Sequence, residues 1–164
     1  MSSRTHRGFK RLLKILLGST LLAVVDIASA VFTMTEIVTP DLGTCFSGAS
    51  GRQFILNTDG TVTGANAADH LFGAISGQLE LIGENADVNI LADNISTFGG
   101  VTVGAVPCRF NTGAQTICDG AGINVAIKKN AARTLYVGVD LTTSQVHNGG
   151  DTASVMYDIT VTFL

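Results

Sequence analysis

Few residues of this chain combine a type and a spacing that could support catalysis. His70 follows Asp69 directly, but neighbouring residues of an extended strand point to opposite faces, so the two do not form an acid–base pair. His147 lies in HNGGD, which is typical of a solvated turn. Three further acidic residues adjoin glycines, where turn formation accounts for them: Asp59, Asp119 and Asp151. We therefore expect no catalytic residue and no enzyme; an exported hydrolase would need an acid–base pair that is not found.

Metal and cofactor sites are also not indicated. The histidines that follow residue 30, His70 and His147, are far in sequence from any pair of closely spaced cysteines, so a zinc site is a poor fit. The segment GENADVN (83–89) could lend oxygens to calcium, but its acidic residues lack the regular spacing of a calcium loop. No segment resembles a phosphate-binding loop. We expect neither a metal nor a cofactor.

The three cysteines predict one disulfide. Cys108 and Cys118 enclose CRFNTGAQTIC, whose turn-rich middle would let them bridge two arms of a hairpin. A loop that short contributes about 2.5–3 kcal/mol in the chain-entropy description. Cys45 could instead pair with either residue across a longer loop. Whichever pair forms, one thiol remains, either buried and inert or available for a bond between subunits; our expectation is Cys108–Cys118, with Cys45 left over.

The first residues have the pattern of a signal peptide. Five basic residues precede the apolar run ILLGSTLLAVV (15–25), and ASA (28–30) supplies the small residues that a signal peptidase reads. We expect residues 1–30 to be removed and residues 31–164 to form one exported domain, in transit through a periplasm to the cell surface or medium. A retained N-terminal anchor is the alternative. No later segment is apolar for long enough to span a bilayer.

Removal of this leader makes the domain acidic. The chain has 10 basic and 13 acidic residues; taking away the five basic residues and Asp26 of the leader leaves 5 and 12, a net charge of −7. Such a surface repels phosphate backbones, which argues against nucleic acid as a partner.

Short alternating runs separated by Gly, Asn and Asp dominate the rest of the chain and predict strands. RQFIL (52–56) followed by NTDG indicates a tight hairpin with positive φ at Gly60. HLFGAISGQLELIG (70–83) is expected to be a strand interrupted by glycines, and RTLYVGVDL (133–141) to form the last hairpin with the closing strand through SQVHNGGD. Further strands are expected in ADVNILAD (86–93), VTVGAVPCRF (101–110) and INVAIKK (123–129). Seven to nine strands in one domain favour an all-β, two-sheet antiparallel sandwich, with a closed barrel as the alternative.

The closing strand SVMYDITVTFL (154–164) raises a question of pairing. Five apolar residues alternate along one of its faces: Val155, Tyr157, Ile159, Val161 and Phe163. It contains no proline, lysine or arginine to discourage pairing at a sheet edge. We therefore expect this strand to be covered by a strand from another chain, in the manner of β-strand addition.

Several segments together resemble a family of bacterial secreted domains catalogued as domain of unknown function 4402. They are PDLGTC (40–45), GRQFILNTDGTVTG (51–64), GQLELIGENADVNILAD (77–93) and DTASVMYDITVTFL (151–164). The resemblance covers most of residues 40–164. It implies an immunoglobulin-like β-sandwich that is exported and, in several members, associated with fimbria-like surface structures.

The C-terminus is also similar to that of chaperone–usher pilus subunits. Those subunits end in an alternating apolar strand with a penultimate aromatic residue, here Phe163, and an upstream glycine, here Gly149 or Gly150. The similarity implies a groove beside the last strand, which a periplasmic chaperone fills first and the N-terminal extension of another subunit, delivered at an outer-membrane usher, fills later. Residues 31–39 would then be a donor or an edge strand, with Phe32, Met34 and Val38 as donor residues in a row that Glu36 interrupts.

These patterns lead to two functional hypotheses. The first is a non-enzymatic structural subunit of a bacterial surface fibre, a fimbria or pilus used in adhesion, which assembles with copies of itself or with related subunits by strand donation. The alternative is a self-complete secreted sandwich that binds a glycan or a surface partner through its Gly-, Asn- and Asp-rich loops.

Overall fold

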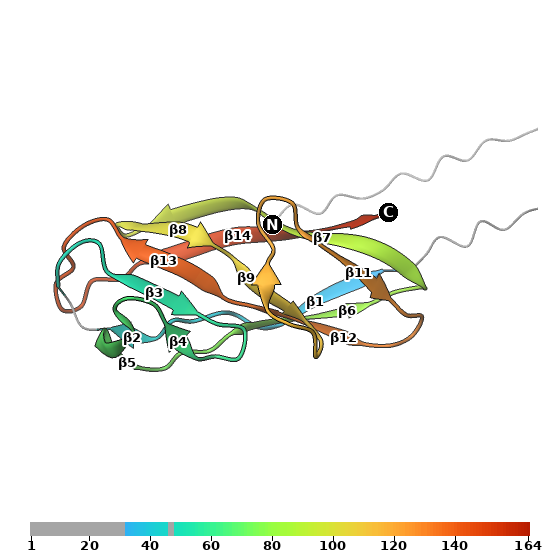
Figure 1. Ribbon diagram of the computed structural model, residues 1–164, viewed down its shortest axis with the longest axis horizontal. Helices are drawn as coiled ribbons and strands as arrows, with labels where there is room; N and C mark the ends of the chain where they lie inside the picture. Colours follow the sequence, from blue (N-terminus) through green and yellow to red (C-terminus); the bar gives the residue numbers. More distant parts are fainter. Residues whose placement is uncertain (1–31, 46–47) are drawn as a thin grey trace, which may run out of the picture.

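The computed structural model describes residues 32–45 and 48–164, and the expected signal peptide lies outside these residues (Figure 1). The described part is nearly all β, as predicted, with antiparallel sheets and one short 3-10 helix. Its elements are β1 (Thr33–Val38), β2 (Thr44–Cys45), β3 (Gln53–Leu56), β4 (Val62–Thr63), η1 (Ala67–Asp69), β5 (His70–Phe72), β6 (Gly77–Ile82), β7 (Ala86–Phe98), β8 (Val101–Ala105), β9 (Pro107–Phe110), β10 (Thr116–Ile117), β11 (Ile123–Ile127), β12 (Arg133–Val137), β13 (Val139–Thr143) and β14 (Ser154–Phe163). Within this part of the chain no helix is long and apolar enough to cross a membrane.

One layer of the fold consists of two sheets, and two pairs of consecutive strands run from one sheet directly into the other. The order is β1-β6-β12-β9-β10 in the first sheet and β4-β3-β13-β8 in the second. β8 continues into β9 through Val106, and β12 continues into β13 through Gly138. Gly138 is required at this crossing, because a Cβ there would collide with the backbone carbonyl of Leu56. The two sheets therefore follow one another along the length of the domain (Figure 1).

The other layer is the three-stranded sheet β11-β7-β14. The inward residues of its central strand, Val88, Ile90 and Ala92, are buried. They pack against Leu81 and Leu135 of the facing layer in the larger of two core clusters. The alternating pattern of ADVNILAD is thus confirmed, and the packing of one layer on the other is that of a β-sandwich.

The predicted disulfide is also present. Cys108 on β9 is bonded to Cys118, with the two Cα atoms 5.8 Å apart, and both residues are fully buried. It closes the arms of the β9–β10 hairpin, in which Thr116 pairs with Cys108. Cys45 is the free thiol. The RQFIL hairpin is confirmed as well, since Ile55 pairs with Thr63 across the turn that contains Gly60 at φ +83°.

Two of the expected strand assignments are wrong. HLFGAISGQLELIG is two elements in different sheets, because β5 pairs with β2 whereas β6 pairs with β1 and β12. RTLYVGVDL likewise divides at Gly138. It forms no hairpin with the closing strand: β13 pairs with β3 and β8, and β14 crosses to the opposite layer and pairs with β7. The loop SQVHNGGD is therefore a connection between the two layers.

Candidate strand-docking groove

β14 is an edge strand of its sheet. It pairs antiparallel with β7, from Ser154 opposite Phe98 to Phe163 opposite Val88, with a shift of register between Met156 and Asp158. In the sheet order β11-β7-β14 it stands last, so no other described strand is bonded to its second edge. In Figure 1 β14 runs beside β7 along the upper side of the domain. An edge this long is a ready template for another strand.

The backbone groups that face this open edge can be assigned from the register. The amide of Leu164 donates to the carbonyl of Asp87, and the amide of Ala92, which is opposite Ile159, donates away from β14 to the carbonyl of Cys118. Hydrogen-bonded and non-hydrogen-bonded pairs alternate in an antiparallel ladder. Thr160 and Thr162 are therefore bonded to β7, whereas the amides and carbonyls of three residues point to the open edge: Ile159, Val161 and Phe163.

The apolar row of β14 lies on the inner face, as the alternation predicted, but it is incompletely covered. Val155, Tyr157, Ile159 and Val161 are half-buried, and Phe163 is 48% exposed. By contrast, the inward residues of neighbouring β7 from Val88 to Ala92 are at most 2% exposed. The difference arises because β7 has a strand on each side and β14 has one.

β1 forms the other wall of the open side. It is the edge strand of the facing sheet and pairs with β6, with Met34 opposite Leu81 and Val38 opposite Gln78. β1 and β14 share no ladder. They meet where the Phe32 and Phe163 rings pack edge to face, with centroids 5.9 Å apart. The expected donor residues thus lie in or beside an edge strand that pairs within its own chain.

A cavity of about 730 Å³ lies at the end of the domain where β14 begins, between β14 and the segment Thr39 to Cys45 that follows β1. Its floor is the second core cluster, which the paired strands β3 and β13 supply: Phe54, Leu56, Val139 and Leu141. Leu42, Val155 and Tyr157 form its sides, and the loop from His147 to Ala153 forms its rim. The floor residues belong to strands that the sequence predicted, but their common role depends on long-range pairing that no local pattern shows.

The hydroxyl of Tyr157 is an unusual group in this groove. It is buried and, among the described residues, has no hydrogen-bond partner. Burial, together with the nearby carboxylate of Glu36 on β1, raises the pKa of Tyr157 to about 12. The Glu36 carboxylate itself accepts a hydrogen bond of 2.8 Å from the Thr39 hydroxyl. The inner face of β14 is therefore apolar except at this one atom.

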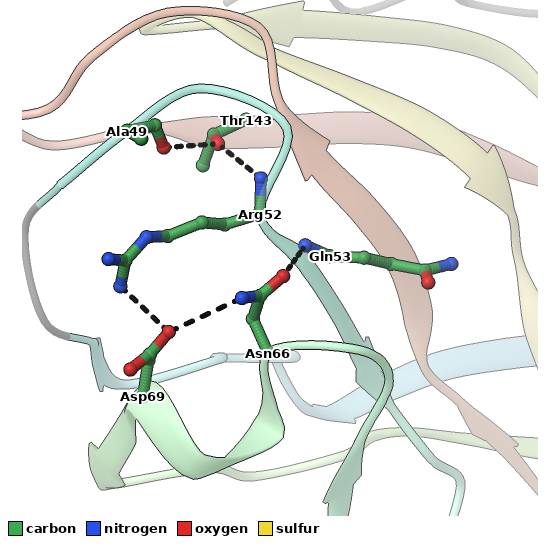
Figure 2. Close-up of polar contacts among 6 residues, drawn as sticks. All are labelled: Ala49, Arg52, Gln53, Asn66, Asp69 and Thr143. Carbon is green, nitrogen blue, oxygen red and sulfur yellow. Dashed lines mark hydrogen bonds and ion pairs between the residues drawn. The ribbon is translucent and has the colours of Figure 1, made fainter.

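A polar network holds in place three residues that line the cavity, Ala49, Arg52 and Thr143 (Figure 2). The Arg52 guanidinium lies 2.7 Å from the Asp69 carboxylate, which also accepts a hydrogen bond from the Asn66 amide. The Asn66 side-chain oxygen in turn accepts from the amide of Gln53. The amide of Arg52 donates to the Thr143 hydroxyl on β13. These contacts join the start of β3 to η1 and to β13, and they were not predicted because Arg52 and Asp69 carry no motif.

Cys45 also lines the cavity. Its thiol is half-buried, and burial followed by the negative charge of Asp69 raises the pKa of Cys45. A thiol with a raised pKa is a poor nucleophile at neutral pH. Cys45 is therefore a side chain that lines the cavity, and its thiol is not activated.

The two described histidines bond to backbone. His70 Nε2 lies 2.9 Å from the carbonyl oxygen of Leu42, and His147 Nε2 lies 3.2 Å from that of Gly100. These contacts place His70 in the β2–β5 region and His147 between two loops. Within the described ranges no three His, Cys, Asp or Glu side chains are grouped in a way that could hold a metal ion.

The acidic residues next to glycines serve local structure. Asp59 accepts from the amide and hydroxyl of Thr61, which lowers the pKa of Asp59. Asp119 accepts from the amide of Val106, at the junction of β8 and β9. Asp151 accepts from the amide of Asn148 in the rim loop, where Gly150 has φ +96°. The upstream glycine of the pilus-subunit resemblance is therefore at the mouth of the cavity.

Comparisons of the chain with protein-family models, with curated proteins and with solved structures found no match.

Proposed function

We propose that this protein is a non-enzymatic structural subunit of a bacterial surface fibre, exported through the periplasm and assembled by donation of a strand to β14. The observation that carries the proposal is the open second edge of β14, bordered by an inner apolar row that remains half-buried. A strand laid against this edge would satisfy the outward amides of Ile159, Val161 and Phe163 and cover that row. The resemblance to bacterial secreted domains and to pilus subunits points in the same direction.

The energetic case rests on side chains rather than on the ladder alone. Covering an apolar side chain of this size contributes roughly 1.5–3 kcal/mol when it passes from full exposure to full burial. The half-buried row of β14 would gain about half of that per residue. A donated strand also brings apolar side chains of its own into the 730 Å³ cavity, above the floor formed by Phe54 and Leu141. These gains have to exceed the cost of ordering the strand.

The donor would be a neighbouring subunit, after a periplasmic chaperone strand had protected the groove. The predicted donor residues Phe32, Met34 and Val38 lie in or next to β1, which is exposed along almost its whole length and is paired on one side only. Donation by this segment of a second copy would require it to leave β6. Donation by a related subunit would leave β1 in place.

Amide hydrogen exchange tests the proposal residue by residue. The full chain is exported in a bacterial host, and the monomeric and multimeric fractions are separated by sedimentation. In the monomer we expect the amides of Thr160 and Thr162 to be protected and those of Ile159, Val161 and Phe163 to exchange rapidly. In the multimer the latter three should exchange at least a hundredfold more slowly, since they would lie in a continuous ladder.

Two outcomes would contradict the proposal. One is a multimer in which the three outward amides still exchange rapidly, because its contacts would then lie elsewhere. The other is a monomer in which they are already protected, because the groove would then be filled by the protein's own chain.

The second result would favour the alternative function, a self-complete secreted sandwich that binds a glycan or surface partner. One observation favours this alternative: the polar loop that includes Asn148 and Asp151 forms the rim of the cavity. Substitution of Asn148 and Asp151 by alanine should then remove glycan binding and leave the exchange of β14 unchanged.

A further inference from the structure

The Tyr157 hydroxyl is the one polar side-chain atom of the inner β14 face that is buried and unpartnered among the described residues. A phenolic hydroxyl can both donate and accept a hydrogen bond. Leaving such a group buried without a partner is costly, and most buried polar groups in folded proteins are satisfied. Phenylalanine would fill the same space without this cost, so folding of the isolated domain does not explain the hydroxyl.

The position of the hydroxyl relates it to the groove. Tyr157 lines the cavity and projects from β14 between the apolar residues Val155 and Ile159. Glu36, on the opposite wall, is the acidic group close enough to act on the hydroxyl. A strand that docks on the open edge of β14 lies between these two walls. Its inward side chains would meet apolar surface at each position except the one beside Tyr157.

We propose that Tyr157 is a specificity determinant of the groove: it selects a partner strand that carries a neutral hydroxyl or amide side chain at one inward position and apolar side chains at the others. This inference rests on the proposed docking of a strand at β14. An acidic side chain at that position is disfavoured, because its negative charge would be repelled by the nearby Glu36 carboxylate. The partner is therefore an extended, alternating apolar segment of another subunit with one uncharged polar residue.

A peptide panel tests the inference on the exported full-length protein. The host peptide has nine residues in which valine alternates with threonine, with lysines added at both ends for solubility. Each inward valine is replaced in turn by serine and by glutamate, and the dissociation constants are measured by calorimetry. The proteins are the wild type, Tyr157→Phe and, as a matched control, Tyr136→Phe on β12. The Arg109 Cζ atom lies 4.3 Å from the centroid of the Tyr136 ring.

We expect one inward position at which serine is accepted by the wild type and by Tyr136→Phe. At that position the ratio of the serine to the valine dissociation constant should rise roughly fivefold in Tyr157→Phe, the effect of one hydrogen bond. At the other inward positions the ratio should be the same in all three proteins. Glutamate at the selected position should weaken binding roughly tenfold, and Glu36→Gln should recover most of that loss.

The outcomes separate this inference from the proposed function. If the valine peptide binds and the serine ratios are equal in the wild type and in Tyr157→Phe at each position, the selection by Tyr157 is refuted while strand docking stands. If no peptide binds the wild type, strand docking itself is refuted. Tyr157→Phe is expected to be at least as stable as the wild type, because it removes an unsatisfied group, so a loss of binding would not reflect unfolding.

Discussion

Proline substitution at two adjacent positions of β14 tests which edge of the strand is free. Val161 and Thr162 both lie near the C-terminal end of β14, but their amides point in opposite directions: that of Thr162 towards β7 and that of Val161 towards the open edge. Proline has no amide hydrogen and is tolerated on the outward side of an edge strand. Val161→Pro should therefore leave the fold almost intact, and Thr162→Pro should not.

The magnitudes follow from the ladder. Thr162→Pro removes a hydrogen bond to the Asn89 carbonyl and places the proline ring against β7, at a cost of about 3 kcal/mol in the free energy of unfolding. Val161→Pro breaks no bond to β7, keeps an apolar ring on the inner face and restricts the unfolded chain, so its net effect should be within about 1 kcal/mol of zero. Val161→Ala controls for the lost side-chain contacts.

The assay is urea unfolding of the exported protein followed by circular dichroism, with sedimentation of the same samples to measure assembly. We expect Val161→Pro to unfold near the wild-type midpoint and to fail to form multimers, because its ring blocks the ladder on the open edge. Equal destabilisation by Val161→Pro and Thr162→Pro would refute this reasoning. It would mean that the Val161 amide already has a partner within the isolated chain.

Three further predictions concern stability. Because the folded-state pKa of Tyr157 is raised to about 12, the folded protein keeps the phenolic proton above pH 10, whereas the unfolded chain loses it. The free energy of unfolding should therefore fall by on the order of 2 kcal/mol between pH 10 and 12. Urea unfolding of Tyr157→Phe over the same pH range should lack this fall. Reduction of the Cys108–Cys118 bond should cost about 2.5–3 kcal/mol, measured by urea unfolding with and without dithiothreitol against a Cys45→Ser control. Gly138→Ala should cost more than 3 kcal/mol, because its Cβ would collide with the Leu56 carbonyl; Gly149→Ala, which has open space around it, should be near neutral in the same measurement.

Local alternation was the most informative feature of the sequence. The period of two placed Val155, Tyr157, Ile159 and Val161 on one face of a strand, and the structure has them on the inner face of β14. The disulfide could be predicted for a similar local reason, since the turn between two closely spaced cysteines brings Cys118, which follows β10, next to Cys108 on the paired strand β9. Both features depend on residues that are near one another in the sequence.

Pairing between distant strands could not be predicted in the same way. The loop between β13 and β14 contains Asn148, Gly149 and Gly150, which are typical hairpin residues, yet it crosses from one layer to the other. The choice of β7 over β13 as the partner of β14 is made by burial in the core, which a local pattern does not contain. Gly138 is the residue from which the division of RTLYVGVDL into two strands could have been predicted, because a glycine inside a strand often marks a close approach of another backbone segment.

The incomplete burial of β14 has one structural cause. β1 closes one sheet and β14 closes the facing sheet, and both edges lie on the same side of the sandwich, where Phe32 contacts Phe163. A ladder between them would have closed the fold into the barrel that the sequence also allowed, but no such ladder joins the described strands. Among the described residues, no strand covers that side, where the Ile159 and Val161 amides point outward and the Tyr157 hydroxyl has no hydrogen-bond partner. A single added strand would bond to the outward amides, cover the half-buried apolar row and offer the Tyr157 hydroxyl a hydrogen-bond partner. All three considerations therefore lead to the same position for the partner.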